Sequence, residues 1–422
     1  MLAASGPGRW PQWFGGAVVL AGLVQLALFA YATAPGLAGT GDSGYYLHAA
    51  QTFRATGHLL NPDGTAYRYW PPLYPVLLSG CGSLAGIRVL HGGCLLGSLL
   101  LWSWLGQHLL LGRRAALLPW LLALSTPWLL VSKFVWAESA FLLVFAAYAA
   151  SLFQWLRTGR RLWWGVATAV GFLLPLQRTL GLFLLAGVGA GVLLGEWRRL
   201  PVRSRWLLTL HLVMSTVGGM LWQWYALLVA GPSRYHPGRG WGQLLSSAAD
   251  YGFVLGRWLL PLPTAGRALL PHGVWAVALL LILGLLWPRR RAEAGLLPEV
   301  AVSKQNDNKI PRRLLLRILW TATVSLVALV SVLTVFAQSA AGLHDAERYA
   351  SVLFAPLLVL TLAAWPARAP HWLQGVVITV WLFSTALRAG HVAADLHRLP
   401  PITPDLWSQP GPHGQHIGAA SQ

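Results

Sequence analysis

The chain has 422 residues, of which 56% are hydrophobic and only 10% are charged. Soluble domains carry about 25% charged residues, so this composition excludes a disordered chain and an ordinary soluble enzyme. The formal net charge is +19, which is typical of nucleic-acid-binding domains, but Lys and Arg also set the orientation of membrane proteins. The two cysteines, Cys81 and Cys94, exclude a disulfide framework. We interpret them as small apolar side chains, although a single pair stays compatible with the spacing.

Apolar stretches dominate the chain. A bilayer core needs roughly 20 apolar residues to be crossed by a helix, and eleven stretches qualify. The sequence therefore predicts an all-α polytopic membrane protein. Pro175 and Arg178 interrupt the run over 162–195, which we interpret as a hairpin of two spans. The expected spans lie near 12–34, 84–108, 115–131, 134–156, 162–177, 179–195, 206–230, 271–287, 318–337, 350–366 and 373–390.

The first span ends in AYATAPG, which is similar to a signal-peptide cleavage region. Its apolar run exceeds the usual 7–15 residues, so we expect an uncleaved signal anchor.

The basic residues predict the orientation of the chain. With the N-terminus placed in the cytoplasm, the inside segments hold 19 of the 31 basic residues and 4 of the 12 acidic residues. The positive-inside rule therefore predicts a cytoplasmic N-terminus and an external C-terminus. The net charge then reflects topology, and no nucleic-acid partner is expected.

Unequal loops divide the chain, and two external segments, 35–83 and 231–270, are long. The basic segment between the two groups of spans is expected to lie against anionic lipid in the cytoplasm. We expect four regions: an N-terminal transmembrane module over 1–287, a linker loop over 288–317, C-terminal transmembrane helices over 318–390, and a mobile external tail over 391–422.

The first external loop carries Asp42 a few residues after the first span. Residues 45–53 carry apolar side chains at helical spacing, which predicts an amphipathic helix lying on the membrane. Asp42 then lies at or near the N-terminus of that helix, where a carboxylate either caps free N–H groups or serves as a catalytic base. Tyr45 and Tyr46, which open the helix, are candidates for substrate contacts.

The second half of this loop is rich in proline and aromatic residues. Asn61 to Gly64 forms a turn signal, and the prolines up to Pro75 are expected to prevent a helix before Val76. The aromatic side chains either stack on a sugar ring or anchor the loop at the membrane surface. Tyr67 and Tyr74 are the candidates for substrate contacts in this group, which comprises Tyr67, Tyr69, Trp70 and Tyr74.

Two charged residues lie within apolar sequence near the outer ends of later spans. A charge at the bilayer centre costs about 2.5–3.5 kcal/mol on insertion scales, so each needs a partner. Glu138, in SKFVWAESAFLL, either pairs with a cation or contacts a ligand. Arg178, in LLPLQRTLGLFLL, needs an anion, which is either a lipid phosphate or Glu138.

The segment HDAERY precedes the tenth expected span. Arg348 is a candidate phosphate clamp, and the alternative is an internal ion pair with Asp345 or Glu347. Tyr349 follows it directly and is a further candidate for a substrate contact. The chain has no GxGxxG motif, P-loop, CxxC pair or HExxH motif, so other chemistries fit the sequence less well. We also expect no metal and no dissociable cofactor, since an arginine can take the place of a metal at a phosphate.

These motifs, taken in order, resemble the GT-C superfamily, which comprises integral-membrane glycosyltransferases that use polyprenyl-phosphate-linked sugars. The pattern is an Asp after the first span, a YY..A segment, G....PPLYP, a Glu at the start of a later span, and ERY before an apolar span. The resemblance covers roughly residues 10–365. It is greatest to bacterial members near the protein O-mannosyltransferases and the aminoarabinose transferase of lipid A, including the group of the rhizobial core galacturonosyltransferases.

The resemblance implies an inverting single displacement in which Asp42 accepts the proton of the acceptor hydroxyl. Many members have a second acidic residue directly after this Asp, but here it is Ser43, which weakens any expectation of a paired-carboxylate or metal site. Glu138 and the two arginines match the family pattern more loosely. Arg178 or Arg348 would stabilise the leaving phosphate.

The expected partners are a polyprenyl-phosphate sugar, membrane lipids, and an acceptor that is a glycan, a lipid or a protein. The resemblance implies a bacterial inner-membrane protein with a periplasmic active site. Two other functions compete with this one. A flippase for a lipid-linked sugar would show internal repeats and charges at mid-bilayer, and we detect neither clearly. A non-catalytic protein of envelope-polysaccharide assembly would tolerate the loss of Asp42.

Overall fold

A computed structural model describes residues 12–110, 112–195, 197, 200–229, 240–260, 262–288, 309–336, 343–365 and 370–402. These residues are almost entirely helical, and two isolated β-bridges join Ala38 to Phe134 and Leu60 to Ala66. The elements are α1 (Gln12–Ala32), α2 (Gly41–Thr56), α3 (Leu73–Ser79), α4 (Leu84–Leu109), α5 (Arg113–Ala123), α6 (Thr126–Lys133), α7 (Glu138–Thr158), α8 (Arg161–Gln177), α9 (Leu180–Gly195), α10 (Val202–Val229), α11 (Gly242–Leu259), η2 (Thr264–Leu269), α12 (His272–Leu285), α14 (Lys309–Phe336), α15 (Leu343–Ala350), η5 (Ser351–Leu353), α16 (Phe354–Ala364) and α17 (His371–Arg398).

Eight stretches of the described chain are long and apolar enough to cross a bilayer, so the protein is a polytopic membrane protein, as the sequence predicts. They are Phe14–Ala32, Leu84–Leu109, Arg113–Lys133, Glu138–Thr158, Val202–Val229, Arg312–Val335, Asp345–Ala364 and Trp372–Arg398. The other three expected spans correspond to α8, α9 and α12, which have 17, 16 and 14 residues. Because these helices are shorter than a typical span, the count of eleven stays a prediction.

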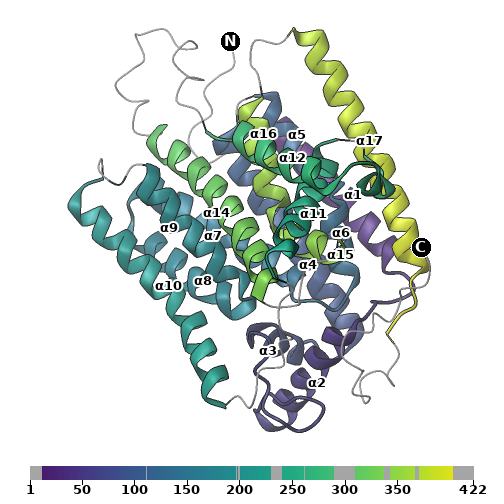
Figure 1. Cartoon of the computed structure of the whole chain (residues 1–422), viewed down its shortest axis with the longest axis vertical. Helices are drawn as coiled ribbons and strands as arrows, with labels where there is room; N and C mark the ends of the chain where they lie inside the picture. The colour runs from purple at the N-terminus through teal and green to yellow at the C-terminus, as the bar shows by residue number, and fades with distance from the viewer. Residues whose placement is uncertain are drawn as a thin grey trace.

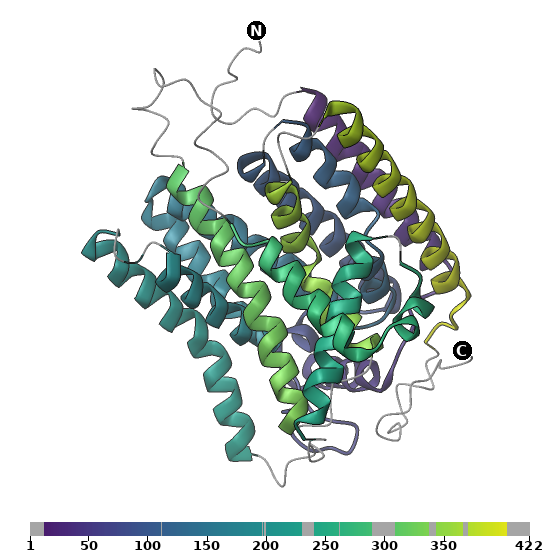
Figure 2. The same cartoon turned by 45° about the horizontal axis from the view of Figure 1, so that its top comes forward.

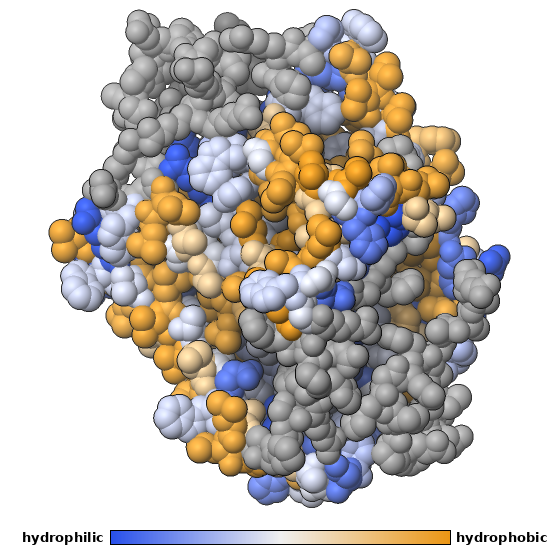
Figure 3. Space-filling model, in the orientation of Figure 1, coloured by the Kyte–Doolittle hydropathy of each residue, from blue (hydrophilic) through white to orange (hydrophobic). Residues whose placement is uncertain are grey.

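The spans differ in how deeply they are buried within the protein. The most apolar window of α7 is 72% buried, whereas those of α10 and α17 are each only 17% buried. The outer helices expose large side chains such as Leu227 and Phe383, which are 76% and 65% exposed. Apolar side chains are exposed over much of the face in Figure 3, and such a surface suits contact with lipid tails.

The first external loop folds as one compact unit at an end of the bundle. Figure 1 shows α2 and α3 together at the bottom, opposite the end at which α1 begins. α2 covers the amphipathic helix expected after Asp42. α3 begins at Leu73 and includes Pro75, which corrects the expectation of a helix only from Val76. A proline is tolerated there because N–H groups of the first turn have no helical partner.

Three further boundaries differ from the sequence-based expectation. The stretch 115–131 is two helices, because Ser125 caps α6 by accepting a hydrogen bond from the backbone N–H of Trp128 at 3.2 Å. α14 begins at Lys309, within the segment expected as a linker. α17 continues to Arg398, within the segment expected as a mobile tail. It lies beside α1, as Figure 2 shows.

The hairpin expected between 162 and 195 is present. α8 ends at Gln177, Arg178 has extended backbone with φ −154°, and α9 begins at Leu180. Gly181 packs against α8 so closely that a Cβ there would lie 2.5 Å from the carbonyl carbon of Leu174. The turn therefore needs a glycine, and it places Arg178 between the end of α8 and the start of α9.

A backbone clasp joins the segment after α1 to the segment before α7. The N–H of Ala38 donates to the carbonyl of Lys133 at 2.9 Å, and the N–H of Val135 donates to the carbonyl of Ala38 at 3.0 Å. The buried Lys133 ammonium also donates to the carbonyls of Ala32 and Gly36, each at 2.9 Å. This clasp fixes the start of α2 relative to the start of α7.

Candidate active site

Asp42 lies in the first turn of α2, where an acidic side chain interacts favourably with the helix dipole. The cap itself is formed by its neighbours, because Thr40 is the N-cap residue and its N–H donates to Oγ of Ser43 at 3.0 Å. The Asp42 carboxylate instead lies 2.9 Å from Nη1 of Arg348, and its side chain is 30% exposed. Of the two roles open from the sequence, the capping role is therefore filled by other residues.

Glu138 is the first residue of α7, and its side chain is fully buried. Its carboxylate forms ion pairs with both Arg178 and Arg348. The end of α8 is held at this point because Gln177 donates from Nε2 to the carbonyl of Ala137 at 3.0 Å. A carboxylate buried between two guanidinium groups is matched in charge and can hold both arginines in place.

Arg348, on α15, links the two carboxylates. Its guanidinium contacts Asp42 and Glu138 and lies over the ring of Trp136, 4.1 Å from the centroid. Trp136 is fixed in turn, because its Nε1 donates to Oγ1 of Thr40 at 2.8 Å. Sequence reasoning missed Trp136, although a tryptophan two residues before a buried acid is a natural partner for a cation.

The internal ion pair considered for Arg348 is not formed with Glu347, which pairs instead with Arg257 on α11. Tyr349 lies on the same side as the two arginines. Its ring centroid is 5.2 Å from the guanidinium carbon of Arg178 and 5.8 Å from that of Arg348. The structure thus brings together Asp42, Glu138, Arg178, Arg348 and Tyr349, which come from widely separated parts of the chain.

Aromatic residues of the first external loop pack beside this cluster around Trp70. The rings of Tyr45 and Tyr46 lie 5.0 and 5.7 Å from it, and that of Tyr67 lies 6.2 Å away. Tyr74 packs edge-on against Tyr46 and lies 2.8 Å from Nε2 of the buried His91. Tyr74 therefore anchors the loop to α4.

Three of these tyrosines, Tyr46, Tyr67 and Tyr74, are buried. Burial raises the pKa of each phenol well above its ordinary value. They stay protonated at neutral pH and act as hydrogen-bond donors rather than bases. Asp42 is left as the partly exposed carboxylate of the site.

Several buried polar atoms at the site have no hydrogen-bond partner among the described residues. They include Nη2 of Arg348, Oε2 of Glu138 and the hydroxyl of Tyr67. A fourth is the hydroxyl of Tyr251 on α11, a residue that the sequence analysis did not single out. Burial raises the pKa of Tyr251, and the nearby Tyr349 and Asp345 raise it further. Unpaired buried polar atoms are uncommon in folded proteins, and these four, three donors and one carboxylate oxygen, surround one cluster.

Other chemistry is not evident in the described part of the chain. It contains no group of three or more His, Cys, Asp or Glu side chains placed to hold a metal ion. Cys81 and Cys94 are both free thiols, so the pairing that the spacing left open is not formed.

No protein-family model matches the chain, and no curated protein matches it either. Among solved structures, it is similar to ArnT from Cupriavidus metallidurans bound to undecaprenyl phosphate. The TM-score is 0.56 at 16% identity, over 90% of this chain and 76% of ArnT. The apo state of the same ArnT gives a TM-score of 0.53 at 14% identity, over 91% of this chain and 76% of ArnT. The chain therefore has the ArnT fold, and the expected resemblance to GT-C proteins is confirmed at the level of the fold.

Proposed function

We propose that the protein is an inverting glycosyltransferase that moves a sugar from a polyprenyl-phosphate donor to an acceptor hydroxyl at the outer face of the membrane. The observation that carries this proposal is the meeting of Asp42 and Glu138 with Arg178 and Arg348 in one buried cluster. The fold is shared with an ArnT whose solved structure contains undecaprenyl phosphate, which supports a lipid-phosphate donor.

The proposed reaction is a single displacement. The acceptor oxygen attacks C1 of the sugar, the bond from C1 to the lipid phosphate breaks, and the phosphate leaves with the bonding electrons. Asp42 accepts the proton that the acceptor oxygen loses. General-base assistance of this kind contributes about 10²–10⁴ in rate, and Asp42 suits this role because its carboxylate is the partly exposed acidic group of the cluster.

The two arginines stabilise the charge that develops on the leaving phosphate. A guanidinium offers two parallel N–H groups to phosphate oxygens, and Nη2 of Arg348 has no hydrogen-bond partner among the described residues. Tyr349 and Tyr251 line the same side and offer hydroxyl groups to the donor. Electrostatic stabilisation of this kind acts strongly in a site from which water is excluded.

Glu138 is assigned a positioning role in this scheme rather than contact with substrate. Its side chain is fully buried and faces both guanidinium groups. It therefore holds the arginines in place for the donor phosphate. The buried Tyr46, Tyr67 and Tyr74 shape the wall beside Asp42, and the less buried Tyr45 is a candidate for stacking on a sugar ring.

The proposed topology has eleven spans, a cytoplasmic N-terminus and the cluster at the periplasmic face of a bacterial inner membrane. It rests on the count of basic residues and on the position of α2 and α3 at the end of the bundle opposite the start of α1 (Figure 1). An acceptor at that face is a lipid A core, another envelope glycan or a protein.

Replacement of Asp42 tests the function. A deletion strain is complemented with the wild type, with Asp42→Asn, or with Asp395→Asn, a control carboxylate whose side chain is 74% exposed on α17. Mass analysis of envelope glycolipids and glycoproteins should show one sugar missing in the deletion strain and restored by the wild type and the control. We expect Asp42→Asn to lower transfer by about 10²–10⁴. Full restoration by Asp42→Asn would exclude the proposed mechanism.

A further inference from the structure

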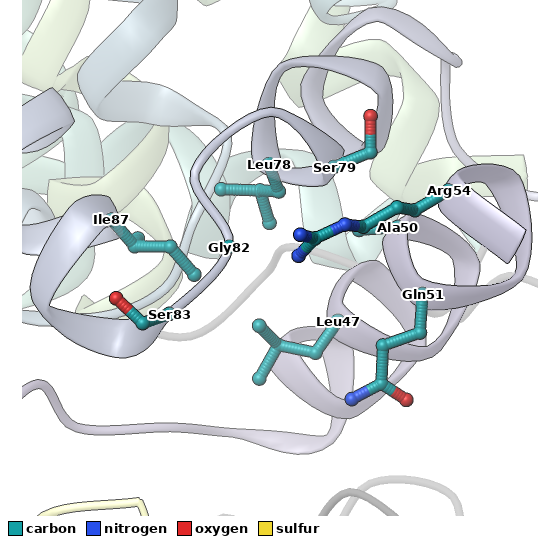
Figure 4. Close-up of a pocket in the computed structure, with 9 residues that line it drawn as sticks. All are labelled: Leu47, Ala50, Gln51, Arg54, Leu78, Ser79, Gly82, Ser83 and Ile87. Atoms are coloured by element: carbon teal, nitrogen blue, oxygen red, sulfur yellow. The ribbon is translucent and has the colours of Figure 1, made fainter.

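A second hollow lies outside this cluster, between α2, α3 and the start of α4 (Figure 4). It is shallow and open to the surface, and the space of about 340 Å³ between its lining atoms includes open solvent. Its floor is apolar and consists of the buried side chains of Leu47, Leu78 and Ile87. None of the residues named above for donor binding lines it.

Arg54 is the charged residue of this hollow. Its guanidinium points into the space between the apolar side chains (Figure 4). The turn before α4 leaves room for it, because a Cβ at Gly82 would lie 3.3 Å from Nη1 of Arg54, and Gly82 has a φ of +70°. None of the lining residues is acidic. Within the described residues, Arg54 has neither an ion pair nor a hydrogen bond.

Two polar side chains, Gln51 and Ser83, lie on the rim, and their polar ends are turned away from the guanidinium (Figure 4). The amide of Gln51 lies one turn before Arg54 on α2. Oγ of Ser83 accepts a hydrogen bond from the N–H of Gly86 at 3.1 Å, which leaves its own hydroxyl hydrogen free to donate. A guanidinium beside an apolar floor can bind an anion that carries an apolar group.

The position of the hollow specifies what that molecule is. Its wall includes Ile87 from the first turn of α4, which begins a candidate span at Leu84. Val89, two residues further, is an apolar side chain that is 76% exposed. The hollow therefore lies where a span leaves the membrane, at the level of the headgroups.

We propose that this hollow binds the headgroup phosphate of an anionic phospholipid of the outer leaflet, with Arg54 as its cation. The apolar floor contacts the glycerol and the first acyl carbons. Basic pockets between helices at a membrane surface bind lipid headgroups in this way. A bound lipid also holds α2 against α3 and α4, and α2 carries Asp42 at its other end.

The test uses the full chain, delipidated in a neutral detergent, with short-chain lipids added. Dihexanoyl phosphatidylglycerol is the anionic probe, and dihexanoyl phosphatidylcholine is its neutral counterpart. Binding is measured by native mass spectrometry for the wild type, Arg54→Gln and Arg398→Gln. Arg398 is the matched control, since its side chain is 79% exposed on α17 and it lines no part of this hollow.

We expect the affinity for phosphatidylglycerol to fall about fivefold in Arg54→Gln, the factor that corresponds to ~1 kcal/mol for one basic residue near anionic lipid. Arg398→Gln should bind like the wild type, and phosphatidylcholine should bind more weakly than phosphatidylglycerol. Arg54→Lys, which keeps the charge, should retain most of the affinity for phosphatidylglycerol. This variant still tests the role of the charge if Arg54→Gln does not fold. Equal affinity of the wild type and both Arg54 variants for phosphatidylglycerol would overturn the proposal.

A final experiment distinguishes binding of a lipid from binding of a free anion. Inorganic phosphate is added to the complex of wild-type protein and phosphatidylglycerol. We expect it to displace the lipid only at much higher concentration, because it makes no contact with the apolar floor. Displacement at equal concentration would overturn the assignment to a lipid and identify a free-phosphate site. The readout is binding, so it does not depend on sugar transfer.

Discussion

Two buried polar networks share α7 and differ in how completely their atoms are paired. In the middle of the helix, Tyr148 bonds Nε2 of His211 at 3.0 Å, and Nδ1 of His211 lies 2.9 Å from Oγ1 of Thr168. At the first residue of the helix, Glu138 holds two arginines, and Nη2 of Arg348 remains without a hydrogen-bond partner among the described residues. The first network is closed and neutral, whereas the second is charged and has unused donors.

The difference in hydrogen-bond pairing suggests that one network serves stability and the other serves function. A network in which every member is satisfied makes the packing rigid and unique. A network with unused buried donors has a cost in the free protein, and a ligand that bonds those donors removes the cost. The closed network around His211 therefore serves to pack α7, α8 and α10, while the open one around Glu138 has the capacity to bind a substrate.

The largest effect is expected from Glu138→Gln. Removal of one partner from a buried ion pair costs about 3–5 kcal/mol because the other charge stays buried and unpaired. Arg178 and Arg348 would lose their shared carboxylate, so both the thermal stability of the detergent-solubilised protein and sugar transfer should fall. Unchanged stability would show that the arginines are held by other groups.

Arg348→Lys should have the next largest effect. Lysine keeps the charge but loses the planar guanidinium that contacts two carboxylates and the ring of Trp136. A lost charged hydrogen bond is worth about 1.5–3 kcal/mol, which corresponds to roughly 10–100-fold in kcat/KM. Steady-state kinetics with a polyprenyl-phosphate sugar measures it. A rate equal to that of the wild type would exclude a bidentate role.

Tyr251→Phe sharpens the comparison, because the hydroxyl of Tyr251 is fully buried and has no partner among the described residues. Its removal should leave the melting temperature unchanged or raise it slightly. Transfer should fall about tenfold, the value of one hydrogen bond worth ~1.4 kcal/mol. Rescue of the rate at high donor concentration would indicate that the hydroxyl binds the donor. A variant that loses stability and keeps full activity would contradict this role.

Tyr148→Phe should show the opposite behaviour, with a loss of stability and the smallest effect on transfer. It removes one hydrogen bond of the closed network and leaves His211 with an unpaired nitrogen. A loss of about 1–3 kcal/mol of stability is expected, with kcat/KM within twofold of the wild type after correction for folded protein. A large loss of activity at unchanged stability would remove the distinction between the two networks.

The sequence revealed the charged members of the open network because charges are rare in apolar spans. Glu138 and Arg178 stand out for this reason, whereas Asp42 and Arg348 stand out because they lie just beyond the ends of spans. The sequence offered Glu138 as one partner for Arg178, and the structure confirms that pair. The sequence did not reveal the contacts of Arg348 with Asp42 and Glu138, because residues so far apart in the chain carry no local signal of contact. Tyr251 was missed because a tyrosine in an external helix carries no signal until its burial is known.

For the fold as well, features set by local sequence were predicted, and features set by contacts between distant segments were not. The apolar runs predicted where helices lie, and Pro175 with Arg178 predicted the hairpin between α8 and α9. The backbone clasp at Ala38 was not predicted, because one residue on each side forms it and neither has a strand pattern. The division of 115–131 into α5 and α6 depends on a cap at Ser125, whose signal is hidden in an apolar run.

Contacts between the first loop and the last helices have a consequence for the synthesis of the protein. The N–H of Ile402, beyond α17, donates to the carbonyl of Leu37 at 2.8 Å, and Arg348 reaches Asp42 from α15. The loop that carries Asp42 thus leaves the ribosome early, whereas the groups that complete its surroundings are synthesised among the last. A nascent chain that ends before α15 already contains Asp42 and Glu138 but lacks Arg348. The cluster of Asp42, Glu138 and Arg348 is therefore complete only once α15 has been synthesised.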